Sequence, residues 1–449
     1  MNYAEAVSSL NGLVPELLTL PGGERRKFTL AEIGLLCAAL GDPQRRFSSV
    51  LIAGTNGKGS TAATLASIAQ AAGIRVGLYT SPHLERVNER VRLSRNGRLA
   101  EIDDETFARH CSTVFGVARQ RMQDGTLRGM PSYFELMTAL AFCAFAEAGV
   151  ELAVLEVGMG GRLDATNIVD PCLSVITDIA LDHQEWLGET IGAIASEKAG
   201  ILREHGVMVT LPQHPEANTA LGEVAVKLAV RGVNAAVYMP ARGTDDSSGY
   251  ALEVMGRQVQ VVSPLHGAHQ QRNVALAIAA AVELTTEKGF SIPPEAIEAG
   301  IRQTEWPGRL ERFTPAGWPE VILDVAHNPA GAWALRAAVS GLDSREPASP
   351  QVLVFGCLRD KPVAELGKIL FPLFDRVVLV AVHSPRATSL EGLQAAAEAT
   401  GALTDCAESL PQALDVARAA AGSQGRIVIS GSVYLVGEAR HWLKTEAGA

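Results

Sequence analysis

The segment Gly54-Thr-Asn-Gly-Lys-Gly-Ser60 brings glycines, a lysine and hydroxyl side chains together in one short stretch. It follows the apolar run Ser49–Ala53 and precedes an Ala-rich helical stretch from about Thr61 to Ala72. Glycines let the backbone approach phosphate oxygens closely, and the N–H groups at a helix N-terminus attract anions. Lys58 adds a point charge for the terminal phosphates. The spacing is not the standard G-x-x-x-x-G-K-[ST], but the position between strand and helix favours a nucleotide phosphate loop over an ordinary Gly-rich turn.

Three further polar residues stand where apolar runs end: Ser81, Glu156 and His183. In an open parallel sheet, ligands bind beyond the carboxyl ends of the strands, so these groups are expected to face one crevice together with the phosphate loop. A hydroxyl, a carboxylate and an imidazole predict a Mg²⁺ site that phosphate oxygens and water complete. Imidazole is an unusual Mg²⁺ ligand, and each residue alone can equally be a strand-end group that the backbone satisfies.

Two other places carry candidate chemistry. Lys198 lies near the end of a short helical stretch, where sequence alone predicts a lysine paired with solvent. Asp324 and His327 follow a strand of the C-terminal part, and Pro329 suits the first turn of a helix. Together with Arg309, these side chains can reach a nucleotide, or the segment can be a simple Asx-type turn.

Short apolar runs alternate with helical patterns, which predicts a mostly parallel sheet covered on both faces. In the N-terminal part the expected strands are Ser49–Ala53, Arg75–Thr80, Leu152–Val157 and Leu173–Thr177, and further helices are expected near 104–123, 132–148 and 270–287. A second series follows Trp306-Pro-Gly, with strands at 321–325, 352–355, 377–382 and 427–430 and helices near 330–341, 362–370, 389–399 and 411–421.

Residues 235–263 break this alternation with three strand-like runs, Ala235–Met239, Tyr250–Met255 and Gln258–Val262, and a polar turn at 242–249. The predicted fold class is therefore α/β with two domains. Residues 1–305 form a P-loop ATPase-type parallel sheet with helices on both faces and a small β excursion. Residues 306–449 form a Rossmann-like α/β domain. The linker is expected near 304–318, which is rich in Pro and Gly.

Composition narrows the classes of function. The 449 residues carry 39 Lys+Arg against 49 Asp+Glu, a net charge of −10, which argues against a nucleic-acid binder. No apolar run approaches the length of a membrane span, and the first residues lack the pattern of a signal peptide. The six cysteines show no C-x-x-C spacing and are expected to be buried free thiols. We therefore expect a cytoplasmic enzyme of small molecules, with no membrane or nucleic-acid partner.

The chain resembles the folylpolyglutamate synthase/dihydrofolate synthase family of Mur-ligase-like amide ligases, from about residue 10 to 440. The motifs that carry the resemblance are GTNGKGS at 54–60, YTSPHL at 79–84, SYFE at 132–135, LEVGMGGRLDATN at 155–167, LDH at 181–183, SEKAGI at 196–201, PGR at 307–309 and DVAHNP at 324–329. One segment departs from the family: a D-L-G-L-E-R stretch that helps to cover the pterin is replaced here by Arg25-Arg-Lys-Phe-Thr-Leu-Ala-Glu32.

The resemblance implies a role for each matching residue. It implies that ATP phosphates are held by Thr55, Asn56, Gly57, Lys58, Gly59 and Ser60, and that other nucleotide contacts come from Asn273, Arg309 and Asp324, with His327 close by. It implies Mg²⁺ ligands at Ser81, Glu156 and His183, and an N-carboxylated lysine at Lys198 beside the metal. It implies pterin contacts at Ser132, Tyr133, Phe134, Glu135, Leu163, Asp164 and Ala165. Catalytic roles would fall to Lys58, Lys198, His183 and His327.

The implied reaction is ATP-dependent addition of L-glutamate to reduced folates and to dihydropteroate through an acyl phosphate, by a monomer that uses Mg²⁺, with a monovalent cation as a further candidate. Phe134 offers a flat apolar face for the pterin and Asp164 a carboxylate for its N–H donors, although they can also be a core residue and a loop cap. The alternatives are an enzyme that only elongates folates, a peptidoglycan-type Mur ligase, and a P-loop switch or kinase.

Overall fold

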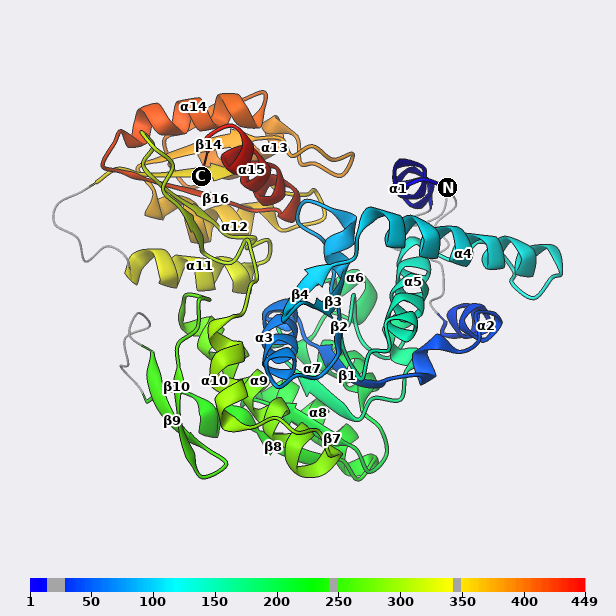
Figure 1. The fold of residues 1–449 in the computed structure, drawn as a ribbon. Helices are drawn as coiled ribbons and strands as arrows, with labels where there is room; N and C mark the ends of the chain where they lie inside the picture. Colours follow the sequence, from blue (N-terminus) through cyan, green and yellow to red (C-terminus); the bar gives the residue numbers. More distant parts are fainter. Residues whose placement is uncertain (14–28, 242–248, 342–348, 449) are drawn as a thin grey trace. The chain divides into compact units, whose positions relative to one another are not determined.

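The computed structural model of the chain describes residues 1–13, 29–241, 249–341 and 349–448 (Figure 1). They divide into two compact units. Unit one comprises Met1–Pro82, Val87–Pro264 and Gln271–Glu305, and unit two comprises Trp306–Ala449 with the short segments His83–Arg86 and Leu265–Gln270. Of the segment that departs from the family pattern, residues 25–28 lie outside the described residues.

Unit one contains an eight-stranded sheet in the order β4-β3-β2-β5-β1-β6-β7-β8. The strands are β1 (Ser48–Ala53), β2 (Val76–Tyr79), β3 (Val91–Arg95), β4 (Arg98–Glu101), β5 (Leu152–Glu156), β6 (Leu173–Ile176), β7 (Val207–Thr210) and β8 (Arg231–Asn234). Pairing is parallel from β2 to β8, while β3 and β4 continue the sheet antiparallel. The central strands are almost continuously apolar and buried, as expected when helices cover both faces.

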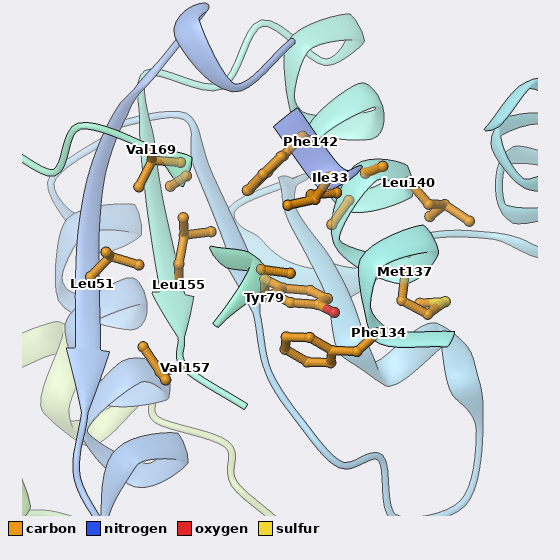
Figure 2. Packing of buried hydrophobic residues seen from close by; sticks show 14 of the residues in the cluster. Ile33, Leu51, Tyr79, Phe134, Met137, Leu140, Phe142, Leu155, Val157 and Val169 are labelled. Atoms are coloured by element: carbon orange, nitrogen blue, oxygen red, sulfur yellow. The ribbon is translucent and has the colours of Figure 1, made fainter. Parts of the chain in front are cut away.

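The helices of this part are α1 (Tyr3–Asn11), α2 (Ala31–Ala39), α3 (Lys58–Ala71), α4 (Asp104–Gln123), α5 (Tyr133–Glu147), α6 (Gln184–Leu187), α7 (Ile191–Lys198), α8 (Pro215–Lys227), α9 (Ala268–Lys288) and α10 (Pro294–Arg302). Small residues let α3 pack closely: a Cβ on Gly300 of α10 would lie 2.3 Å from the Cα of Ile68. On the other side, α5 packs its apolar side chains against Leu155 and Tyr79 (Figure 2).

Unit two contains a six-stranded sheet in the order β11-β12-β16-β13-β14-β15, in which only β11 runs antiparallel to its neighbour. Its strands are β11 (Glu311–Phe313), β12 (Glu320–Leu323), β13 (Gln351–Phe355), β14 (Arg376–Val380), β15 (Thr404–Ala407) and β16 (Arg426–Ser430). Its helices are α11 (Pro329–Gly341), α12 (Val363–Leu370), α13 (Leu390–Glu398), α14 (Leu410–Ala421) and α15 (Val433–Thr445). The predicted α/β class and the alternation of strands and helices are confirmed in both units.

One predicted strand is wrong. Ala235–Met239 is not extended: Ala235–Tyr238 forms a 3-10 helix, and the strand β8 ends just before it. The Asn234 side chain explains the change, because its oxygen accepts the N–H of Ala236 at 2.9 Å and starts the helical turn. The other two runs pair as the antiparallel strands β9 (Tyr250–Val254) and β10 (Arg257–Val261). The polar turn predicted at 242–249, before these two strands, lies outside the described residues except for Gly249.

All six cysteines are free thiols, but only Cys37, Cys111 and Cys357 are buried; Cys143 and Cys172 are partly buried and Cys406 is exposed, which corrects the expectation of buried thiols. Cys406 lies in β15, a strand at the edge of the sheet whose residues are mostly exposed or partly exposed. None of the helices within the described ranges is long and apolar enough to cross a membrane.

Candidate functional site

The phosphate loop joins β1 to α3, and its glycines are required by close neighbours. Gly57 has φ +86°, and a Cβ there would lie 2.1 Å from the Oδ1 of Asn273. A Cβ on Gly54 would lie 1.8 Å from the Oγ1 of Thr177. The helix begins at Lys58, three residues earlier than predicted, so the N–H groups of its first turn follow directly after the loop. Asn273, predicted as a nucleotide contact, is thereby packed on the loop.

Two N–H groups of the loop serve to anchor it. The N–H groups of Thr55 and Asn56 donate to the carbonyl oxygen of Asp178 at 2.8 and 3.1 Å. The Thr55 hydroxyl donates to the Ala180 carbonyl at 3.0 Å and accepts the Ala180 N–H at 3.1 Å. The loop is thus fixed to the segment after β6, and the N–H groups in the first turn of α3 are of the kind that can bind an anion.

Lys58 and Lys198 converge on one carbonyl group. The Nζ of Lys58 donates to the Gly54 oxygen at 3.2 Å and to the Thr55 oxygen at 3.1 Å. The Nζ of Lys198 donates to the same Gly54 oxygen at 2.7 Å. Lys198 is only 4% exposed, so the interpretation of this residue as a solvent-facing lysine is wrong. Burial, followed by the charge of Lys58, lowers the pKa of Lys198 to about 7, so the neutral amine is well populated near neutral pH.

The carboxyl ends of β2, β5, β1 and β6 lie side by side, as the sequence predicts for the candidate groups. Ser81 follows β2, and Glu156, 5% exposed, is the last residue of β5. The Oε2 of Glu156 accepts the backbone N–H of Ser81 at 3.0 Å, so these two residues are in contact. His183 follows β6 in a left-handed conformation, and its N–H donates to Asp182 at 2.9 Å.

A buried carboxylate beside a hydroxyl group fits Mg²⁺, which binds one or two protein carboxylates and fills its shell with phosphate oxygens and water. Within the described parts of the chain, no three His, Cys, Asp or Glu side chains are grouped so as to hold a metal by themselves. An ion at Glu156 and Ser81 would therefore rely on the oxygens of a nucleotide.

A pocket opens beside this edge of the sheet. Its lining contains four of the seven residues predicted to bind the pterin, namely Phe134, Leu163, Asp164 and Ala165. Sequence reasoning missed the other lining residues, which are Met159, Gly160, Gly161, Trp186, Leu187 and Glu197. The first three belong to the same loop motif and could have been included on that ground. Ser132, Tyr133 and Glu135 do not line the pocket; Ser132 and Glu135 cap the start of α5 reciprocally.

Phe134 and Asp164 each line the pocket and also make a structural contact. The ring of Phe134 packs against Tyr79 at a centroid distance of 5.8 Å (Figure 2). The Asp164 carboxylate accepts the N–H of Met159 at 2.9 Å, the N–H of Thr166 at 3.0 Å and the Thr166 hydroxyl at 2.6 Å. Burial raises the pKa of Asp164, while these hydrogen bonds oppose the shift. Both residues are therefore core or cap residues that also face the pocket.

In unit two, Asp324 lies after β12 and is 7% exposed. Its oxygens accept the N–H groups of Leu310 at 3.0 Å and Ala326 at 2.9 Å. The bond from Ala326 forms the Asx-type turn considered from the sequence. Burial raises its pKa, and the charges of Arg309 and His269 oppose that shift. The Nδ1 of His327 lies 2.8 Å from the Val325 oxygen.

Known proteins resemble this chain over most of its length. Residues 52–281 match the Mur ligase middle domain, and residues 308–433 match the Mur ligase glutamate ligase domain. The folylpolyglutamate synthase of Lacticaseibacillus casei is 35% identical over 452 residues, covering 99% of each chain. The dihydrofolate synthase/folylpolyglutamate synthase of Bacillus subtilis is 34% identical over 422 residues, covering 92% of this chain and 95% of that protein.

The solved structure of E. coli FolC in complex with DHPP and ADP has a TM-score of 0.83 at 31% identity, and the match covers 99% of this chain and 98% of that one. Such coverage spans the phosphate loop, the pocket and the whole of unit two. Together with the two Mur ligase domains, it shows that the chain belongs to the dihydrofolate synthase/folylpolyglutamate synthase family of Mur ligases.

Proposed function

We propose that this chain is an ATP-dependent ligase that adds L-glutamate both to dihydropteroate and to reduced folates that already carry glutamate. One observation carries the proposal. Two consecutive residues of α7 connect the pocket with the phosphate loop: Glu197 lines the pocket, and Lys198 donates a hydrogen bond to Gly54. An acceptor whose pterin occupies the pocket therefore lies beside the place where phosphate binds.

The chemistry follows from the weak reactivity of a carboxylate toward an amine. Transfer of the terminal phosphoryl group of ATP to the acceptor carboxylate gives an acyl phosphate and ADP. The amine of glutamate then attacks the acyl carbon, phosphate leaves and an amide forms. Lys58 and the N–H groups at the start of α3 stabilise the charge of the transferred group. Ser81, Glu156 and His183 would hold Mg²⁺, which would supply positive charge to neutralise the phosphates.

Lys198 is proposed to act as a carbamate. Its neutral amine attacks CO₂, an N–C bond forms while one C=O bond of CO₂ becomes a C–O⁻ bond, and one proton is released, so that a neutral side chain becomes an anionic one. The full burial of the side chain and its position beside Lys58 support this role, because a second cation beside Lys58 is unfavourable and an anion is not. The carbamate would lie next to the phosphate loop.

The remaining assignments are proposals at the level of single residues. Residues 1–305 would hold the phosphates, the metal and the pterin, with Asn273 on the nucleotide. Residues 306–449 would supply further nucleotide and glutamate contacts, among them Arg309, Asp324 and His327. Arg309 is half-buried, and Asp324 is held by a hydrogen bond from Leu310, the residue next to Arg309. Both observations support the nucleotide role.

The test is an assay of ADP release with ATP, Mg²⁺ and glutamate, in which dihydropteroate and tetrahydrofolate are offered in turn. Both acceptors should support glutamate-dependent release, and Lys58→Ala should lower turnover at least about 10²-fold, roughly 2.7 kcal/mol of barrier. Extension of tetrahydrofolate without any product from dihydropteroate would show an enzyme that only elongates folates. ADP release that is independent of glutamate would refute the ligase itself.

A further inference from the structure

The pocket loop, which comprises residues 158–167, rests directly on the backbone at the end of α7. A Cβ on Gly161 would lie 2.8 Å from the Glu197 oxygen and 3.0 Å from the Lys198 Cα. From the other side, a Cβ on Gly200 would lie 2.3 Å from the Cβ of Arg162. Neither surface has room for a methyl group, so the pocket loop and the lysine-bearing segment are in backbone contact.

Hydrogen bonds join the same two segments. The N–H of Arg162 donates to the Glu197 carbonyl at 2.9 Å, and their side chains form an ion pair at 2.5 Å. The Nδ2 of Asn167 donates to the carbonyl of Arg162 and to the carbonyl of Gly200, each at 3.0 Å. The amide of Asn167, which is 7% exposed, is thus a single group that holds both segments.

Arg203 determines which way this amide points. Its Nη2 donates to the Oδ1 of Asn167 at 2.8 Å, to the Asn167 carbonyl at 3.1 Å and to the Val169 carbonyl at 2.8 Å. A guanidinium group can only donate, so the amide oxygen faces Arg203 and the amide nitrogen faces the two carbonyls. The network therefore fixes the donor side of Asn167 toward Arg162 and Gly200.

We propose that Asn167 is a positioning residue of the ligase reaction, which sets the place of Lys198 relative to both the acceptor pocket and the phosphate loop. The inference rests on the proposed role of Lys198. Asn167 touches neither reacting group; it acts through the Gly200 and Arg162 backbone. Catalytic groups must be placed within fractions of an ångström, so a loosened contact here should reduce turnover more than it weakens substrate binding.

The variant Asn167→Asp tests this inference. It keeps the size of the side chain and an oxygen for Arg203, but it replaces the two N–H donors with an oxygen that faces two carbonyls. A displacement of Lys198 by up to about 1 Å predicts a fall in kcat of roughly 10- to 100-fold, while the KM values for ATP and acceptor stay within about threefold. The signal of ¹³C-labelled carbamate, formed from labelled bicarbonate, should require more bicarbonate than in the wild type.

A matched control separates positioning from folding. Asn88 is 1% exposed and its Nδ2 donates to the Ile102 carbonyl at 2.9 Å, away from the pocket loop and α7. Asn88→Ala should lower the melting temperature but leave the bicarbonate dependence of the carbamate signal unchanged. If Asn167→Asp does not fold, Asn167→Ala, which removes the donors without adding a charge, takes its place in the same measurements.

The outcomes are distinct. A lower kcat together with a weakened carbamate signal supports the inference. A kcat within twofold of the wild type overturns it, and so does a lower kcat with a carbamate signal like that of the wild type. A wild-type protein that shows no carbamate, combined with an active Lys198→Ala variant, refutes the proposed role of Lys198 itself, whatever Asn167→Asp does.

Discussion

Each unit places a carboxylate at the end of a buried parallel strand, and the two are held differently. Glu156 accepts a hydrogen bond from Ser81, which follows the neighbouring strand β2. Asp324 accepts a bond from Ala326, which closes its own turn, and a second bond from Leu310, which lies just before β11. The first arrangement joins two strand ends at the edge that carries the lysines. The second joins Asp324 to its own turn and to the segment before β11, so this carboxylate stabilises local structure in addition to the nucleotide contact proposed for it.

The largest expected effect is at the lysines that distinguish unit one. Lys198→Ala should reduce ligase turnover by at least about 10³-fold, since it removes the group proposed to carry the carbamate, a loss of roughly 4 kcal/mol of transition-state stabilisation. Turnover is measured with saturating ATP, glutamate and tetrahydrofolate, and circular dichroism checks the fold. Short carboxylates such as acetate should restore part of the activity, whereas full activity without rescue would contradict the proposal.

The two carboxylates can be compared directly by removing one charge at a time. Glu156→Gln keeps an oxygen for the Ser81 N–H but loses the charge for Mg²⁺, so turnover should fall about 10²-fold with little change in stability. Asp324→Asn leaves one buried N–H without its acceptor, so the free energy of unfolding should fall by about 1–3 kcal/mol. Activity assays and urea unfolding are carried out on both variants. A Glu156→Gln variant that loses stability but keeps its turnover would contradict the comparison, and so would an Asp324→Asn variant of unchanged stability.

A smaller effect is expected at the glycine that packs on Asn273. Gly57→Ala should lower turnover about tenfold or more, because the added Cβ would lie 2.1 Å from the Asn273 Oδ1 and displace the phosphate loop. Gly73→Ala is the matched control, since Gly73 has a similar φ of +82° but no atom within 4 Å of the added Cβ. Equal losses of turnover in the two variants would mean that backbone strain, not the contact, is responsible.

The smallest effect concerns pH. Burial lowers the pKa of Lys198 from 10.5 to about 7, so between these values the unfolded chain binds a proton that the folded chain does not. Stability therefore rises with pH across this window, and the cost of the buried charge is fully present below pH 7. In CO₂-depleted buffer, Lys198→Met should raise the melting temperature more at pH 6.5 than at pH 9.5. An equal increase at both pH values would show that protonation of Lys198 does not destabilise the folded protein.

The sequence predicted the edge of the sheet well, since strand ends and glycines leave local patterns that need no tertiary information. The phosphate loop and Ser81 follow strands, and Glu156 ends one, as expected. The burial of Lys198 could not be predicted in this way, because α7 is short and the partner of the Lys198 amine, the Gly54 carbonyl, lies far away in the sequence. The prediction of a strand at Ala235 was wrong for a local reason, because the side chain of Asn234 caps a helical turn there.

The pocket shows a different limit. Leu163 and Asp164 were found through a motif, whereas Trp186 and Leu187 come from the single-turn helix α6. Only the tertiary fold brings α6 next to the loop, so no pattern within either segment could pair them. Long-range contacts of this kind decide which residues share a cavity, and they are the part of the site that spacing along the chain does not contain.

The close packing of Gly161 on the backbone of α7 has a consequence for changing the acceptor by directed evolution. Residues added or enlarged in that loop would press on the segment that carries Lys198, so new substrate preference would come at the expense of turnover. Trp186 and Leu187 line the same pocket from a helix of four residues. Libraries for altered acceptors should therefore vary Trp186 and Leu187 and leave Gly161 unchanged.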